Sequence, residues 1–295
     1  MRRDETPQMT RGRLVEIGGG RRLRVVVSGP SAPDAPLVFL EAGAFGFSAD
    51  WSEMQNLLAA RGGASLAYDR AGLGFSDPGP APRDSSAIAA DALALLAAMA
   101  HRGPLILCGH SMAGLHLRVL APQVATRVLG IVLVDAAMPE AMDSKILSRF
   151  VEPFAGVSKL AAWGAEAGVM KLFAGPLGDA IGLQGEAAEE KRWAFASPTH
   201  NHWAAQEAAT WAVSSEQGRR AGPFDPQWPV AAIQAGPKGP SGGLRDLQSA
   251  PAKASSRGMT ETVAAATHAS ILSAAHAGAV VRGVEHVFNA VGSSL

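Results

Sequence analysis

Residues 105–114 read LILCGHSMAG, an apolar segment of strand length that ends at a serine between small residues. A helix-compatible run, residues 115–121, follows at once. A serine in a sharp turn between a strand and a helix has the sequence context of a nucleophile elbow. Such a turn strains the serine backbone, and small residues two positions away relieve clashes with the helix. Gly109 fits the first position, and Ala113 stands where glycine is usual. Ser111 is therefore a predicted nucleophile, and its alternative role is that of a helix cap.

The composition limits the class of protein. A chain of 295 residues can form one large α/β domain with an inserted subdomain, and 47% apolar with 18% charged residues is typical of a well-buried globular protein. The net charge is zero, so nucleic acid is a poor candidate partner. Cys108 is the single cysteine, which rules out a disulfide within the chain and favours a reducing compartment. Because no apolar stretch resembles a signal peptide or reaches spanning length, we expect a cytoplasmic protein without membrane insertion.

Apolar strand-like runs alternate with helical patterns along the first part of the chain. Two runs around a triple-glycine turn predict an antiparallel hairpin, 14–17 with 23–27. The following strands are expected at 37–40, 64–68, 105–108 and 128–134, and the helices at 51–60, 86–100 and 112–121. Continuous apolar strands separated by helices predict a mostly parallel sheet that is covered on both faces.

The pattern changes after residue 138. Helical periodicity dominates residues 139–227, and strand-like runs resume at 229–235 and 262–266, before a final helix at 276–291. The sequence therefore predicts a core of residues 13–138 and 228–295, a helical cap insertion of residues 139–227, and a flexible leader of residues 1–12.

Three further segments extend the pattern around Ser111. Residues 37–46 (LVFLEAGAFG) and 67–78 (AYDRAGLGFSDP) are strand ends that break into glycine-containing turns, and Thr267-His268-Ala269-Ser270 follows the last strand-like run. Together they resemble the α/β-hydrolase fold superfamily, in particular bacterial members with Glu-Ala-Gly in the first oxyanion-loop segment. The resemblance covers about residues 13–136 and 229–290. It implies a sheet flanked by helices, an inserted helical cap, and a catalytic order of serine, acid and histidine.

A serine hydroxyl becomes a good nucleophile only when a neighbouring imidazole accepts its proton. His268 lies after the last predicted strand, where the fold supplies its histidine, and is the predicted base. His276 is the reserve candidate.

The sequence leaves the identity of the catalytic acid undecided. The fold commonly supplies it after the strand at 229–235, but residues 236–243 hold no carboxylate. Asp135 ends the preceding strand, from which some family members supply their acid, and a carboxylate there needs a partner such as an imidazole N–H. Asp246 is the alternative acid, although the helix predicted at 244–253 would carry it away. A site without a conventional acid is the third alternative.

Backbone groups are the expected oxyanion donors. The N–H of Met112 follows the nucleophile, and the N–H of Ala44 lies in the early loop, so both are placed to stabilise a tetrahedral intermediate. Phe45 and Phe47 are candidate walls of the acyl site, and Trp203 of the predicted cap is a further candidate.

Other polar residues are expected to be architectural or spectators. Glu41 replaces the histidine common before the loop glycine, and a buried carboxylate there needs a cation, for which Arg70 is the candidate. His200 and His202 have a spacing seen in metal sites, but no third ligand is apparent, so no metal is expected. The glycines at 72 and 74 do not follow a dinucleotide-binding spacing, and no cofactor is expected.

These features predict a serine hydrolase that cleaves an ester or related bond of a small, apolar acyl substrate through an acyl-enzyme. The same site also supports lactone, amide or carbon–carbon bond hydrolysis and cofactor-free haloperoxidation. A serine nucleophile argues against dehalogenase or epoxide hydrolase chemistry, which needs a carboxylate. The alternative from another class is a non-catalytic ligand-binding protein on the same scaffold.

Overall fold

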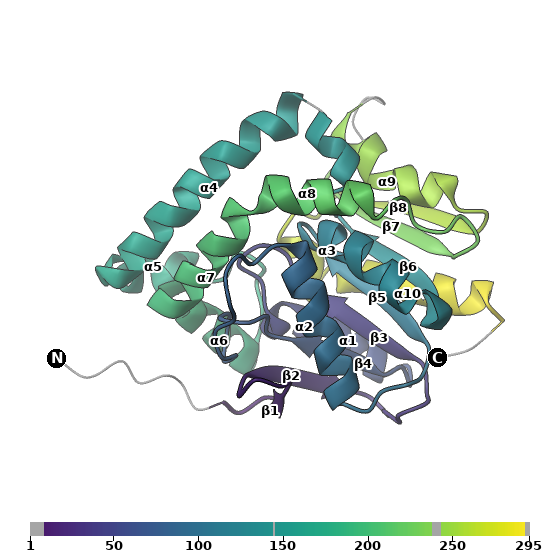
Figure 1. Cartoon of the computed structure of the whole chain (residues 1–295), viewed down its shortest axis with the longest axis horizontal. Coiled ribbons are helices and arrows are strands. Elements are labelled where there is room, and N and C mark those ends of the chain that lie inside the picture. The colour runs from purple at the N-terminus through teal and green to yellow at the C-terminus, as the bar shows by residue number, and fades with distance from the viewer. Residues whose placement is uncertain (1–8, 144, 238–242, 293–295) are drawn as a thin grey trace.

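The computed structural model describes residues 9–143, 145–237 and 243–292, and within them the centre of the molecule is an eight-stranded sheet (Figure 1). The strand order is β1-β2-β4-β3-β5-β6-β7-β8. The first two strands form the predicted antiparallel hairpin, and the strands from β4 to β8 pair in parallel, which confirms the predicted fold class. The strands are β1 Arg13–Glu16, β2 Arg22–Ser28, β3 Leu37–Glu41, β4 Ser65–Tyr68, β5 Leu105–His110, β6 Val128–Val134, β7 Val230–Ala235 and β8 Gly258–Val263.

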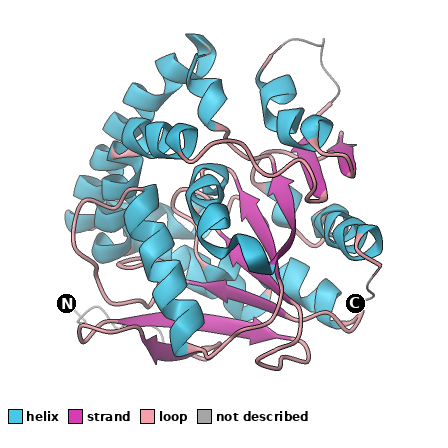
Figure 2. Cartoon of the chain, turned by 45° about the vertical axis from the view of Figure 1, so that its right-hand side comes forward, coloured by secondary structure: helices cyan, strands magenta, loops and turns pink. Residues whose placement is uncertain are grey.

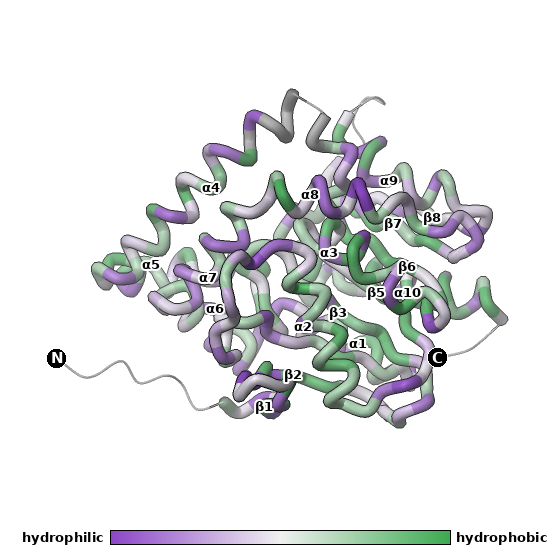
Figure 3. Tube along the Cα trace, in the orientation of Figure 1, coloured by the Kyte–Doolittle hydropathy of each residue, from purple (hydrophilic) through white to green (hydrophobic). Residues whose placement is uncertain are grey.

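The core lies on both faces of this sheet because successive side chains of a strand point to opposite sides. In β3, Val38 and Leu40 pack on one face, under α1 (Ser52–Ala59) and α10 (Ala277–Ala290). Leu37 and Phe39 pack on the other face, under α2 (Ser85–Ala98), α3 (Ala113–Leu120) and α9 (Leu244–Ala254). Since both faces are buried, the central strands are mostly apolar, and they form hydrophobic segments of the chain trace (Figure 3).

The helices between β6 and β7 form a layer beside the carboxyl ends of the strands, and we call them the cap (Figures 1 and 2). Two buried ion pairs connect the cap to the core, Arg24 with Glu190 at 2.6 Å and Arg70 with Glu207 at 2.7 Å. The cap consists of η3 Pro139–Asp143, α4 Lys145–Glu166, α5 Val169–Leu177, α6 Gly185–Ala196, α7 Pro198–Ala209 and α8 Trp211–Arg220.

The last strand differs from its prediction. The sequence indicates a strand at 262–266, whereas β8 spans Gly258–Val263 and residues after it turn away. This strand lies at the edge of the sheet and is partly exposed, so it admits the polar residues Thr260 and Glu261, and the strand-like run used for the prediction begins only after them. The correction matters because the loop after β8, which carries His268, is longer than expected.

Short 3-10 helices complete the chain, namely η1 Ser48–Trp51, η2 Ala121–Arg127 and η4 Ser270–Leu272. Most of the predicted leader, residues 1–8, lies outside the described residues. Among the helices that the structure describes, none combines the length and the apolar character needed to cross a membrane.

Candidate active site

Ser111 sits in the turn between β5 and α3 with φ of +56°, a left-handed conformation that is strained for a residue with a side chain. Its N–H donates to the carbonyl of Val134 at 3.1 Å, and its own carbonyl accepts from Ala137 at 2.8 Å. A Cβ atom at Gly109 would lie 2.8 Å from Leu117 and 3.0 Å from the methyl of Ala113. The turn therefore needs glycine at 109, and the absent side chain there leaves room for the unusual Ala113.

His268 connects the serine to a carboxylate. Its Nε2 lies 2.9 Å from Ser111 Oγ, and its Nδ1 lies 2.6 Å from Asp135 Oδ2. Because an ionised carboxylate only accepts hydrogen bonds, Nδ1–H donates to Asp135 and Nε2 is left to accept the serine proton. Asp135 also sits in a left-handed turn, with φ of +43°, and its Oδ1 accepts from the N–H of Ala235. Three residues from three separate loops thus form one continuous hydrogen-bonded series, which we call the relay.

The surroundings favour a charged Asp135. Burial by itself would raise its pKa, but the hydrogen bond and charge of His268 and the N–H of Ala235 hold the pKa of Asp135 below its ordinary value. The alternative acid, Asp246, lies on α9, where its Oδ1 accepts from Lys253 Nζ at 2.7 Å. The geometry brings Asp135, and not Asp246, to His268.

His110, the residue before the serine, contacts the backbone and the ring of His268. Its Nε2 donates to the carbonyl of His268 at 2.9 Å, and the two rings lie 4.7 Å apart. Burial, followed by the nearby His268, lowers the pKa of His110 to about 3, so the ring is neutral and its Nε2 carries the proton. The sequence predicts no role for this side chain in holding the loop of His268.

The two expected oxyanion donors lie where the strands end. Met112 begins the turn into α3, and Ala44 lies in the loop after β3. A Cβ atom at Gly43 would lie 2.9 Å from Ser111 Cβ, so this loop approaches the serine directly. In the part of the chain that the structure describes, no group accepts a hydrogen bond from the N–H of Ala44 or of Met112. Both donors remain available to a ligand oxygen.

Two cavities meet at Ser111, with volumes of about 330 and 440 Å³. Both are lined by Ala44, Phe45, Ser111 and His268. The smaller cavity is mostly apolar but includes the polar side chains of Lys191, Asp50, His200 and Asn201. The larger one is lined chiefly by apolar and aromatic side chains, Phe154, Trp211 and Leu244 among them. Phe45 packs edge-to-face against Phe154, with ring centroids 6.3 Å apart.

Two of the predicted pocket residues lie elsewhere. Phe47 is completely buried and packs edge-to-face against His200, behind the cavity wall. Trp203 covers the turn at Gly72, where an added Cβ would lie 2.2 Å from its ring. Neither side chain lines the two cavities beside Ser111, because both are used to seat the cap on the core. Phe45 alone of the three predicted pocket residues reaches the cavities.

The pair expected between Glu41 and Arg70 is present and belongs to a larger buried network. Arg70 Nη1 lies 2.7 Å from Glu41 Oε1, and Tyr68 donates to the other oxygen of Glu41 at 2.5 Å. The cap adds Glu207, which the sequence analysis missed, because its partner lies 137 positions away and no local pattern links the two residues. Among the described residues, no group of three potential ligands could hold a metal ion.

Buried histidines with lowered pKa values predict acid sensitivity of the fold. Burial lowers the pKa of His110 and His200 to about 3 and that of His116 well below its ordinary value. The unfolded chain takes up protons on these histidines near pH 6.5 and the native protein does not, so their contribution lowers stability as the pH drops below 6.5. The expected slope reaches about 1.4 kcal/mol per pH unit for each histidine.

Urea unfolding between pH 7.5 and pH 5 measures this slope. The variant His116→Gln removes one titrating group that lies outside the relay, and its slope is expected to be shallower by about one proton. An unchanged slope in this variant would contradict the assignment of a neutral, buried His116.

The sheet order, the strained serine turn and the relay together define a protein with the architecture of an α/β hydrolase. Residues 37–282 match the alpha/beta hydrolase family, and the chain therefore belongs to that family. This confirms the resemblance noted from the sequence. No curated protein matches the chain at a significant level of sequence similarity.

Solved structures share the fold at low sequence identity. An enol-lactonase from Burkholderia xenovorans is 19% identical with a TM-score of 0.63, covering 92% of this chain and 99% of its own. A thermophilic esterase from Thermogutta terrifontis is 17% identical with a TM-score of 0.65, and the coverage is 94% and 99%. The epoxide hydrolase CorEH is 16% identical with a TM-score of 0.69, and the coverage is 95% and 99%. These similarities establish the fold and leave the reaction to be argued from the site.

Proposed function

We propose that this protein is a serine hydrolase that cleaves esters of small apolar substrates. The observation that carries the proposal is the hydrogen-bonded series Ser111–His268–Asp135, with its 2.9 and 2.6 Å contacts, at the junction of two cavities. A nucleophile, a base within hydrogen-bond reach, and a group that orients the base are the arrangement that activates a serine. A protein that only binds ligands does not need this arrangement.

The reaction proceeds in two halves. Ser111 Oγ attacks the ester carbonyl while His268 Nε2 accepts its proton, and Asp135 stabilises the resulting imidazolium. The carbonyl oxygen becomes negative and accepts hydrogen bonds from the N–H groups of Ala44 and Met112. Collapse of this intermediate expels the alcohol, which takes the proton from His268, and leaves an acyl-enzyme. Water, deprotonated by the same histidine, then attacks the acyl-enzyme; the bond to Ser111 Oγ breaks, His268 returns the proton to this oxygen, and the acid is released.

The cavities suggest the kind of substrate. Because they meet at Ser111, one can receive the acyl part and the other the alcohol part of an ester. Their linings are mostly apolar, which favours alkyl or aryl groups over charged ones. Ser111 stands where an epoxide hydrolase needs a carboxylate nucleophile, so hydrolysis through an acyl-serine is the reaction that this site supports best.

A series of p-nitrophenyl esters from acetate to decanoate tests the proposal, together with labelling by a fluorophosphonate. We expect covalent labelling, and kcat/KM that rises about fourfold per methylene until the cavity is filled, since a buried methylene contributes about 0.8 kcal/mol. The heat-unfolded protein, which has lost the relay, is the control for labelling. A native protein that neither turns over any ester nor reacts with the fluorophosphonate would refute the proposal.

A further inference from the structure

Arg70 holds the backbone of the loop that carries Ala44. Its Nη1 donates to the carbonyl of Ala42 at 2.6 Å, and its Nη2 donates to the carbonyl of Gly43 at 2.8 Å. Arg70 is 2% exposed, so these hydrogen bonds form away from water. Two successive carbonyls of the loop are therefore held by one side chain, and the carbonyl of Gly43 also accepts from the N–H of Gly46 at 3.0 Å.

Fixing the carbonyl of Gly43 also fixes the direction of the next N–H. A trans peptide unit is planar, and its C=O and N–H point in opposite directions. In the described chain the one cis peptide bond is Ala81–Pro82, so the unit between Gly43 and Ala44 is trans. Its carbonyl points at Arg70, so the N–H of Ala44 points away from Arg70, and Ala44 itself lines both cavities beside Ser111.

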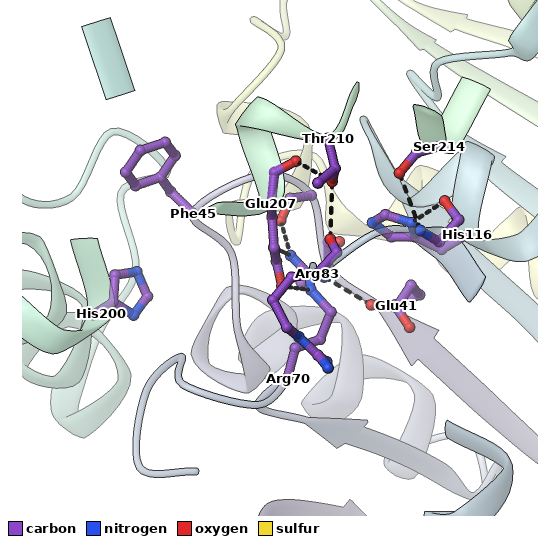
Figure 4. Close-up of polar contacts among 12 residues, drawn as sticks. Glu41, Phe45, Arg70, Arg83, His116, His200, Glu207, Thr210 and Ser214 are labelled. Carbon is purple, nitrogen blue, oxygen red and sulfur yellow. Dashed lines mark hydrogen bonds and ion pairs between the residues drawn. The ribbon is translucent and has the colours of Figure 1, made fainter. Parts of the chain in front are cut away.

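The cap completes the hydrogen bonding of this arginine. Glu207 of α7, which is completely buried, accepts from Arg70 Nε at 2.9 Å and from Nη2 at 2.7 Å (Figure 4). Glu41 accepts from Nη1 on the core side. A guanidinium has five N–H donors, and here all five are used, two of them by the loop carbonyls and two by Glu207. The position of the guanidinium thus depends on the cap as much as on the core.

Further contacts connect the cap helices α6 and α7 to the core near this loop. Lys191 of α6 donates to the carbonyl of Phe45 at 3.2 Å and is held by Asp50 at 2.7 Å. Phe45 has φ of +57°, a strained value that its surroundings must maintain. At the end of α7, the hydroxyl of Thr210 donates to the carbonyl of Arg83 at 3.0 Å (Figure 4). The helix that carries Glu207 is therefore fixed at its end to the core.

We infer that Glu207 is a positioning residue for the oxyanion hole, acting from the cap through Arg70 on the N–H of Ala44. This inference rests on the proposed hydrolase function and extends it, because it makes the contact between Glu207 of α7 and Arg70 a requirement for stabilising the transition state. Glu207 touches neither the relay nor the reacting atoms, so its effect reaches the reaction only through the loop.

The variant Glu207→Gln tests the inference with little change in shape. A glutamine offers one acceptor oxygen and turns an NH₂ group towards an arginine donor, so one N–H of Arg70 loses its acceptor and the guanidinium shifts. The matched control is Glu190→Gln. Glu190 is likewise a buried cap carboxylate paired with a buried core arginine, Arg24, at 2.6 Å, but it does not contact the loop.

The readouts are kcat and KM for a p-nitrophenyl ester and the dissociation constant of phenylboronic acid, which forms a tetrahedral adduct with an active serine. We expect Glu207→Gln to lower kcat and to weaken boronic acid binding by about ten- to a hundredfold. KM is expected to stay within about twofold of the native value, and the midpoint of the pH profile within about 0.3 pH units, since the relay is untouched. Glu190→Gln is expected to lower the melting temperature and to leave kcat and boronic acid binding within about twofold.

Several outcomes separate the alternatives. Should Glu207→Gln lose thermal stability like Glu190→Gln but keep kcat and boronic acid affinity, Glu207 would be structural only and the inference would fail. A native protein without ester turnover or boronic acid binding would instead count against the proposed function. If Glu207→Gln does not fold, Glu207→Asp keeps the buried charge with a shorter reach, and the same loss of kcat at unchanged KM is expected of it.

Discussion

Ser111→Ala is expected to lower kcat for ester hydrolysis by about 10⁵- to 10⁶-fold, as loss of the nucleophile does in serine proteases. The substitution removes the single atom that attacks the carbonyl, and His268 then has no hydroxyl to deprotonate. The cavity walls and the N–H groups of Ala44 and Met112 remain, so ligand binding is expected to persist. Residual turnover about 10³-fold above the reaction in water is consistent with this binding. Steady-state kinetics with the best p-nitrophenyl ester measure the loss.

The same variant is expected to resist covalent labelling by a fluorophosphonate, while its affinity for a slowly hydrolysed amide analogue stays within about twofold. Ser249→Ala serves as the control, because Ser249 is a buried serine that hydrogen-bonds within α9, away from the relay. If Ser111→Ala kept most of the native kcat, the nucleophile would have to be another group and the proposed mechanism would be wrong.

Asp135→Asn is expected to lower kcat at neutral pH by about 10⁴-fold, the size of the corresponding effect in a serine protease. Asparagine can donate its amide N–H to His268 Nδ1, which places the imidazole proton on Nε2, facing Ser111 Oγ. A ring in this tautomer cannot accept the serine proton. The native carboxylate avoids this because its pKa is held below its ordinary value, so it stays ionised throughout the neutral and mildly acidic range.

Asp246→Asn is the matched control for this prediction, since the sequence offered Asp246 as the alternative acid. It removes an exposed pair with Lys253, for which a stability loss of about 0–1 kcal/mol and an unchanged kcat are expected. A collapse of kcat in Asp246→Asn with an active Asp135→Asn would reverse the assignment. Parallel rate measurements on the two variants decide between the two carboxylates.

Much of the fold could be predicted because both faces of the sheet are buried. A strand such as β3 or β5 is then apolar up to its last residue, and a helix between two such strands stands out by its longer period. The prediction failed at β8, where partial exposure at the sheet edge admits threonine and glutamate into the strand. Whether a strand lies at the edge of a sheet is decided by the tertiary structure, and the local sequence indicates it only weakly.

Part of the candidate site could likewise be predicted from the sequence, and part of it could not. Ser111 and His268 were predictable because each follows a strand end, and parallel strands bring their carboxyl ends to one edge of the sheet. The choice of Asp135 over Asp246 needed the structure, since it depends on which carboxylate reaches Nδ1 of His268. Likewise, Phe47 and Trp203 are aromatic residues in plausible places, and only their packing shows that they face the core and the Gly72 turn.

The sequence alone thus determined the alternation of strands and helices, the strained serine turn and the histidine after the last strand, because each is written in residues adjacent along the chain. Tertiary structure decided which distant charges meet. Arg70 needs acceptors for five N–H groups once it is buried, and it finds them on β3, on the following loop and on α7 of the cap. Buried donors must be satisfied, but any suitably placed acceptor satisfies them, so only the folded chain selects Glu207.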